Sequence, residues 1–185
     1  HDKAVYYIKK TIPQYEKIKD SSEKRMQIAK GNSNIGLKFL SINLDSAASY
    51  FKKSLQIQGK IEVKNFNVAN YTGLGEVYNR KKEHQLAIEY LKKAEQLNET
   101  VQDGFYMTSI YELIQDSYGS IGNKKEYEKY KMLYLENLKT ENEEKLNGVK
   151  TFVKEVREQS DTAIEENRKK TYLVVSVGIL ATALM

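Results

Sequence analysis

Residues 68–101 read VANYTGLGEVYNRKKEHQLAIEYLKKAEQLNETV, and this stretch decides the fold of the chain. Its apolar and small side chains recur three or four residues apart, which is the spacing of one face of an α-helix. We therefore expect two helices, at about 62–81 and 84–98, that form a hairpin. The residues expected to pack this hairpin are Tyr71, Leu74, Gly75 and Tyr78 in the first helix, and Ala87, Leu91 and Ala94 in the second.

Equivalent positions recur along the chain at an interval close to 40 residues. Repetition at a fixed interval predicts hairpins that cannot bury their apolar faces alone and need a neighbouring hairpin. The recurring positions are Ala4, Ala47, Ala87 and the bulkier Tyr127 for a small residue at the helix crossing; Phe39, Tyr78 and Tyr118 for an aromatic residue near the end of each first helix; and Gly36 and Gly75. In the hairpin at 26–58, Phe51 is the large apolar residue.

Turn and capping residues divide the chain into further helices. Pro13 is expected to kink or break the first helix, and Asp45 is the predicted N-cap of the third. Asn123 followed by Glu126 predicts a capping box, and Gly59 predicts a C-terminal stop. The remaining expected helices lie at about 2–18, 22–42, 45–58 and 105–121, with a last one starting near 124.

The spacing of residues 68–101 resembles the tetratricopeptide repeat (TPR) almost position for position. This resemblance implies an all-α fold: a TPR-like superhelix of antiparallel hairpins over 1–138, followed by a long C-terminal helix. Such scaffolds usually bind other molecules and do not catalyse reactions. The hairpin at 105–138 departs from the pattern, because Tyr127 replaces the small residue and Lys131 the large apolar one. We expect Tyr130 and Tyr134 to supply the packing there.

TPR superhelices usually bind a peptide or a partner helix in a concave groove lined by the first helix of each hairpin. The amides of Asn34 and Asn79 can both donate and accept hydrogen bonds, so they suit a ligand backbone. Three carboxylates make one end of the groove acidic and favour a basic segment; the alternative is a set of ordinary solvated side chains. The groove positions implied by the resemblance are Lys30, Ser33, Asn34, Leu37, Thr72, Glu76, Asn79, Glu112 and Asp116.

Catalytic, cofactor and metal chemistry have little support in the sequence. The chain has no Cys, and its two histidines, His1 and His84, are far from metal-ligand spacing. The Gly-Leu-Gly at 73–75 follows no strand, so we interpret it as a helix-packing feature and not as a phosphate-binding loop. The net charge of +5 is modest and includes no aromatic-interleaved Arg cluster, which argues against nucleic-acid binding. We expect no enzyme activity and no cofactor.

Residues 139–171 read as a long charged amphipathic helix. Leu146, Val149, Val153 and Val156 follow a 3-4-3 spacing, which smaller or polar residues continue as far as 167. Such spacing is typical of a coiled coil, and it predicts a homodimer through 146–167. The alternative is a capping helix that folds back over the last hairpin.

The last fourteen residues, 172–185, carry no charge. As a helix they would span about 21 Å, whereas a bilayer core needs about 30 Å. We therefore expect the start of a truncated transmembrane helix and a chain that is part of a longer protein. The alternative is a short apolar helix packed on the repeats.

Repeats, a charged helix and a membrane segment occur in this order in bacterial sensors that carry a histidine kinase or an AraC- or LuxR-type helix-turn-helix output domain. This resemblance implies a sensory region anchored to a membrane, with the repeats in the periplasm. The basic residues at 168–170 would instead place the repeats in the cytoplasm. A membrane-tethered assembly adaptor and a soluble TPR peptide receptor are the other functions considered.

Overall fold

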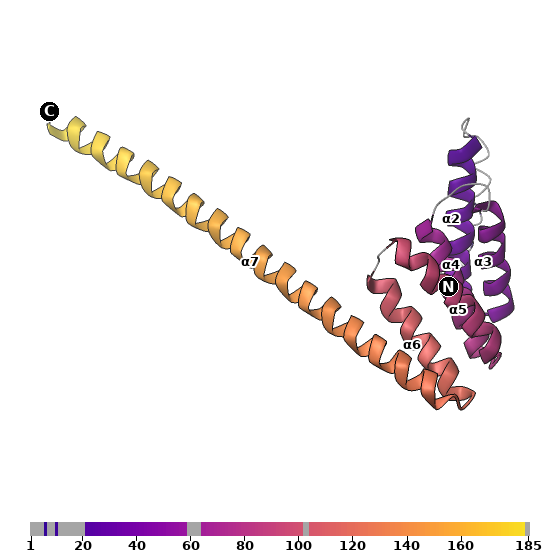
Figure 1. Cartoon of the computed structure of the whole chain (residues 1–185). Helices are drawn as coiled ribbons and strands as arrows, with labels where there is room; N and C mark the ends of the chain where they lie inside the picture. Colours follow the sequence, from indigo (N-terminus) through magenta and orange to yellow (C-terminus); the bar gives the residue numbers. More distant parts are fainter. Residues whose placement is uncertain (1–5, 7–9, 11–20, 59–63, 102–103, 184–185) are drawn as a thin grey trace. The chain divides into compact units, whose positions relative to one another are not determined.

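The structure is a computed structural model that describes residues 6, 10, 21–58, 64–101 and 104–183. Every element in these residues is an α-helix, so the all-α prediction is confirmed (Figure 1). The predicted helix at 2–18, with Ala4 and Pro13, falls outside the described residues except at Tyr6 and Lys10, as does the stop at Gly59. The helices are α2 (Ser21–Phe39), α3 (Leu44–Gln58), α4 (Lys64–Arg80), α5 (His84–Val101), α6 (Gly104–Ser120) and α7 (Lys124–Ala183).

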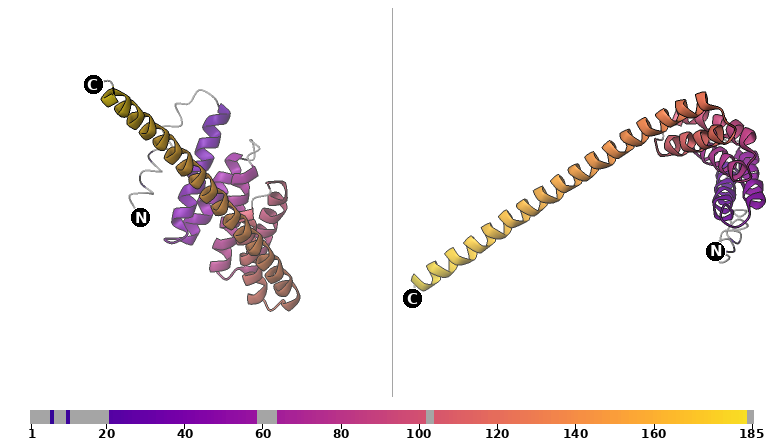
Figure 2. Two further views of the ribbon diagram at one scale, coloured as in Figure 1. Left: turned by 90° about the vertical axis from the view of Figure 1, so that its left-hand side faces the viewer. Right: turned by 90° about the horizontal axis from the view of Figure 1, so that it is seen from below.

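The chain divides into two compact units, residues 1–139 and 140–185. Within the first unit, α2 packs on α3 and α4 on α5, while α3 contacts α4 and α5 contacts α6 (Figures 1 and 2). The first helices of the hairpins also touch in series, α2 with α4 and α4 with α6. This row of first helices is the feature of the fold that positions the candidate site.

The turn after α4 has a characteristic helix-ending geometry. The Glu83 N–H donates to the Tyr78 carbonyl at 2.9 Å, and the Lys82 N–H donates to the Asn79 carbonyl at 2.9 Å. These two bonds define a Schellman motif, which requires a left-handed residue after the helix. Lys82 has that conformation, with φ of 63°. The turn after α6 repeats the motif 40 residues later, with Gly122 at φ of 74°.

Asparagine side chains cap the N-termini of α3 and α7. The predicted cap of α7 is confirmed, because the Asn123 side-chain oxygen accepts the Glu126 N–H at 3.3 Å. The predicted cap of α3 is wrong: the side-chain oxygen of Asn43 accepts the Ser46 N–H at 2.8 Å. Asp45 instead lies in the first turn of α3, where its negative charge interacts favourably with the positive end of the helix dipole.

Glycines bring the helices of the first unit into close contact. The ring of the fully buried Phe51 lies between α2 and α4. A Cβ on Gly36 would approach the Phe51 ring to 2.7 Å, and one on Gly73 would approach it to 2.5 Å. A Cβ on Gly75 would clash with Leu91 of α5. Two of the residues predicted to pack the hairpins, Phe39 and Tyr71, are half-buried. The predicted packing residues that are buried are Gly36, Ala47, Phe51, Leu74, Gly75, Tyr78, Ala87, Leu91 and Ala94.

Aromatic rings stack within each hairpin, at positions that repeat along the chain. Tyr78 stacks on Tyr90 with ring centroids 5.3 Å apart, and Tyr118 stacks on Tyr130 at 5.8 Å. Each pair lies 40 residues from the other, so both hairpins use the same contact. The Tyr130 hydroxyl, which is fully buried, also accepts a hydrogen bond from the Lys92 ammonium of α5. This bond ties the α4–α5 hairpin to the next one.

The last hairpin accommodates Tyr127 by moving the small residue to the opposite helix. A Cβ on Gly119 of α6 would lie 3.1 Å from the Tyr127 ring, so Gly119 provides the close approach. Tyr130 is fully buried, as expected of a residue that supplies packing, whereas Tyr134 is half-buried. Lys131 pairs with Glu128 at the surface at 3.8 Å.

A buried polar chain joins three helices. The Ser54 hydroxyl of α3 donates to the Ala29 carbonyl of α2 at 2.8 Å, and the Asn70 amide of α4 donates to the same hydroxyl at 2.9 Å. Both Ser54 and Asn70 are fully buried. Since an unpaired buried polar group costs free energy, this chain favours one alignment of the two hairpins.

The second unit contains the continuation of α7, which runs unbroken through Gly148 to Ala183. Side chains from 142 to 173 are exposed along this helix. Among the described residues, no helix has an apolar stretch long enough to cross a bilayer.

Candidate functional site

A cavity of about 360 Å³ lies between two neighbouring first helices, α4 and α6. Four residues predicted for the groove line it, two from each helix. Three further lining residues were not predicted. The complete lining is Glu76, Asn79 and Arg80 from α4, with Ser109, Glu112, Leu113 and Asp116 from α6.

The α6 wall follows from the pattern of buried residues in that helix. Ile110 and Ile114 are fully buried and hold α6 against the core. Glu112 and Asp116 come two residues after these isoleucines, roughly 200° further around the helix. Both carboxylates are therefore exposed, one turn apart on the same face, and both line the cavity.

The charges of the two walls differ. On α4, Arg80 pairs with Glu76 at 2.6 Å and donates from its other terminal nitrogen to the Leu40 carbonyl at 3.0 Å. On α6, neither Glu112 nor Asp116 has an ion pair among the described residues. The helix itself contains no Lys or Arg. The cavity therefore presents two uncompensated negative charges beside one neutralised pair.

Asn79 is held in place from the following helix. Its side-chain oxygen lies 2.7 Å from Nδ1 of His84, the first residue of α5. Because an amide oxygen only accepts, Nδ1 is the donor of this hydrogen bond in the tautomer that carries its proton there. His84 thus orients an amide that lines the cavity.

The other predicted groove residues do not line this cavity. The Thr72 hydroxyl is buried and donates to the Val68 carbonyl at 2.9 Å, which commits it within α4. Ser33 is also buried, and the Lys30 ammonium lies 5.0 Å from the Phe66 ring centre. Asn34 and Leu37 are exposed on α2. The cavity therefore brings together only the later part of the predicted groove.

The three lining residues that were not predicted carry a recognisable signal. Arg80 stands four residues after Glu76, Ser109 three before Glu112, and Leu113 one after it. The i, i+3 and i, i+4 spacings place the first two on the same helix face as a predicted residue. Extending each predicted position by one turn would have found Arg80 and Ser109.

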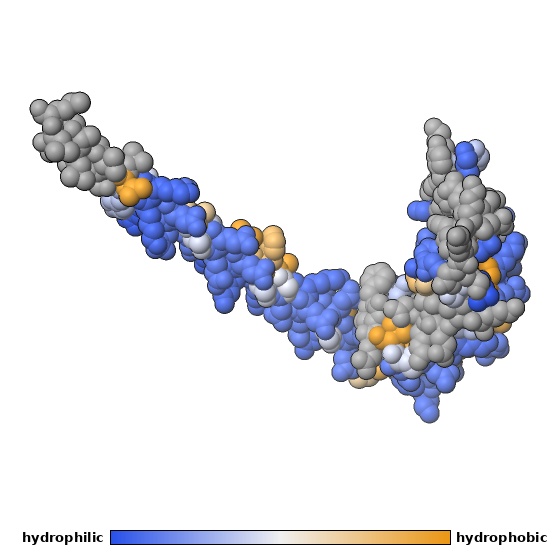
Figure 3. Space-filling model, turned by 90° about the horizontal axis from the view of Figure 1, so that it is seen from above, coloured by the Kyte–Doolittle hydropathy of each residue, from blue (hydrophilic) through white to orange (hydrophobic). Residues whose placement is uncertain are grey.

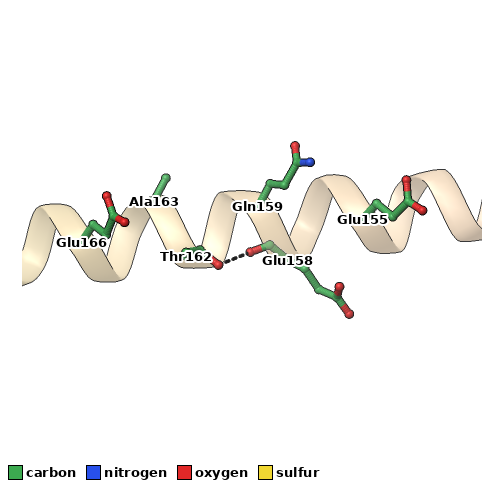
Figure 4. A pocket seen from close by; sticks show the side chains of 6 residues that line it. All are labelled: Glu155, Glu158, Gln159, Thr162, Ala163 and Glu166. Carbon is green, nitrogen blue, oxygen red and sulfur yellow. Dashed lines mark hydrogen bonds between the residues drawn. The ribbon is translucent and has the colours of Figure 1, made fainter.

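A larger hollow, of about 420 Å³, lies on α7 in the second unit. Figure 4 shows that its side chains project from successive turns of one helix, and no second element encloses them. The Thr162 hydroxyl donates to the Glu158 carbonyl at 2.8 Å, as in an ordinary helix (Figure 4). This hollow is an open helix surface and lacks the second wall of a binding site.

Within the described part of the chain, no group of three His, Asp or Glu side chains is arranged to hold a metal ion. No family model matches the sequence, and no curated protein matches it significantly. The chemistry of the cavity is therefore argued from its own residues: an acidic, half-open hollow that can accept cations and hydrogen-bond donors.

Proposed function

We propose that the first unit is a non-catalytic binding region, and that the acidic cavity between α4 and α6 holds a basic segment of a peptide or protein. Glu112 and Asp116 would accept hydrogen bonds from Lys or Arg side chains. Such hydrogen bonds join two charged groups and are stronger than those between neutral groups. Asn79 would bond the backbone of the bound segment.

The observation that carries this proposal is the uncompensated pair on α6. Like charges at i and i+4 destabilise a helix by about 0.2–0.5 kcal/mol. Two other like-charged pairs at this spacing occur in the described helices, Glu95 with Glu99 and Asp161 with Glu165. In each of them one carboxylate is paired with a lysine, Glu95 with Lys92 and Glu165 with Lys169. On α6 the like-charged pair faces a cavity, where a ligand can supply the missing cation.

We further propose that the helical stack is TPR-like. Three observations support this: equivalent residues recur every 40 positions, glycines bring paired helices together, and the first helices touch in series. In such a stack the concave surface is lined by first helices, and α4 and α6 are first helices.

The wider role that we propose is sensory. A ligand in the cavity would alter the stack, and α7 would carry the change towards the apolar segment at 172–185, a membrane anchor with the repeats on the periplasmic side. The support for this role is the order of parts in the sequence. A tethered adaptor would use the same cavity without transmission.

Binding can be tested with fluorescent peptides on the full chain. A peptide with paired Lys or Arg residues should bind, whereas a matched Glu peptide should not. Glu112→Gln together with Asp116→Asn should weaken binding at least tenfold, since a hydrogen bond to a charged group contributes about 1.5–3 kcal/mol. Glu89→Gln, on the exposed face of α5, is the matched control. Equal affinity of the wild type and the double variant would reject the cavity as the site.

A further inference from the structure

Large apolar side chains form an exposed stripe on α7 within the second unit. We define the α7 stripe as Leu146, Val149, Phe152, Val153 and Val156; their side chains are between 47% and 64% exposed. Figure 3 shows hydrophobic residues gathered along one edge of this helix. A contiguous apolar surface of this kind on an otherwise charged helix marks an interaction site.

The spacing of the stripe indicates the shape of its partner. Leu146, Val149, Val153 and Val156 stand at heptad positions a, d, a and d, and Ser160, Ala163 and Asn167 continue the register. A seven-residue repeat stays on one face only when two helices coil around each other with a left-handed twist. The stripe therefore fits another helix that carries the same repeat.

The charge of the helix argues against a membrane surface or a nucleic acid as the partner. Residues 140–167 contain eight carboxylates and four basic side chains, so this segment is negative in a chain that is positive overall. Anionic lipid headgroups and phosphates attract basic surfaces. A helix of this composition would be repelled by both.

We infer that a second copy of this chain covers the α7 stripe, in a parallel two-stranded coiled coil with the same residues facing each other. In this register, the apolar layers at 146, 149, 153 and 156 meet identical layers. The small residues at 160 and 163 also meet their equals, and the two Asn167 amides can bond each other. A polar a-position of this kind specifies register and strand number.

The flanking positions make one unfavourable and one favourable contact in this arrangement. Lys145, at a g position, faces Lys150 of the other copy, but Lys145 is already paired with Glu141 of its own helix at 2.5 Å. The next g position is Phe152, which faces Arg157 of the other copy, a favourable cation–π pair. An antiparallel alignment of the apolar layers would instead place Ala163 opposite Lys139 and Asn167 opposite Leu135.

Cysteine cross-linking on the full chain tests both the partner and the orientation, because the natural sequence contains no Cys. Val149→Cys places the thiol at a d layer and should give a covalent dimer on mild oxidation. Thr151→Cys, on the outer face of the same turn, is the matched control and should stay monomeric. Cross-linking only between a Val149→Cys copy and a Val153→Cys copy would overturn the parallel arrangement.

Light scattering on the unmodified chain is the second measurement. We expect twice the monomer mass, and Val149→Glu with Val153→Glu should reduce it to the monomer mass while the first unit keeps its melting temperature. A wild-type chain that is monomeric at every concentration would overturn the inference. This proposal does not depend on the acidic cavity, because the peptide-binding test concerns residues of the first unit only.

Discussion

The ring of Phe51 in α3 rests directly on the backbone of Gly73 in α4, so that a Cβ at position 73 would lie 2.5 Å from the ring. This contact joins two successive hairpins, and Gly36 of α2 approaches the same ring, where a Cβ would lie 2.7 Å from it. The position of α4, and with it one wall of the cavity, therefore depends on the absence of a side chain at residue 73.

Gly73→Ala should destabilise the first unit. The new methyl group has to displace a buried aromatic ring, and overpacking of this kind costs about 1–3 kcal/mol. Gly148→Ala is the matched control, because nothing lies within 4 Å of its Cβ position and Ala is the better helix former. Urea unfolding followed by circular dichroism measures both; equal midpoints for Gly73→Ala and the wild type would contradict the packing described.

Lys82→Gly should stabilise the chain. Lys82 has a left-handed backbone conformation that costs an L-residue about 1 kcal/mol, and glycine avoids most of this cost. The turn after α6 supplies the reverse experiment, because Gly122 has the same left-handed conformation. Gly122→Ala should therefore destabilise the chain by a similar amount. Thermal unfolding of the two variants should show shifts of opposite sign. A lower melting temperature for Lys82→Gly would show that its side chain matters more than its backbone.

Stability should fall at alkaline pH. The hydrogen bond to Tyr78 raises the pKa of Lys52, and burial raises the pKa of Tyr111. The pKa of each group is near 10 in the unfolded chain. When folding raises a pKa, the group stabilises the fold below the unfolded-state pKa, and this contribution is lost as the pH rises through the folded-state pKa. Unfolding free energies measured from pH 8 to 11 should therefore decline above about pH 10. In Tyr111→Phe the decline should be shallower; an unchanged slope would contradict the assignment.

Arg80→Gln should strengthen the binding of a basic peptide. Arg80 neutralises Glu76 at 2.6 Å, so it competes with any cation that enters the cavity. Its removal leaves three carboxylates uncompensated, and we expect several-fold tighter binding that weakens with added salt. Lys125→Gln, at an exposed position on α7, changes the net charge equally and should have little effect. Equal gains from both variants would point to overall charge and not to Arg80.

Much of the helix pattern was predictable because it depends on local chemistry. The hairpin at 62–98, the start of α7 and the cap at Asn123 all follow from side-chain spacing and capping preference. The cap at Asn43 was missed because Asp45 is an equally good cap by residue type, and only the path of the chain out of α2 distinguishes them. Lys82 gives no sign in the sequence that it takes a left-handed conformation.

The candidate site was predictable in part. Glu76, Asn79, Glu112 and Asp116 lie on helix faces that the 40-residue interval brings together, so their positions line one cavity. The prediction that Thr72 lines the groove was wrong for this cavity, because its hydroxyl donates to a carbonyl of its own helix. Residue spacing does not show this hydrogen bond. Arg80 stands one turn after Glu76 and could have been found from that spacing. Its hydrogen bond to the Leu40 carbonyl could not, because that bond depends on the packing of α2 against α4.

The most direct test of the account is a map of amide chemical shifts in the full chain while a Lys- and Arg-containing peptide is added. We predict that the shifts concentrate on Glu76–Arg80 of α4 and Ser109–Asp116 of α6. Shifts confined to other helices of the first unit, with these two segments unchanged, would contradict it.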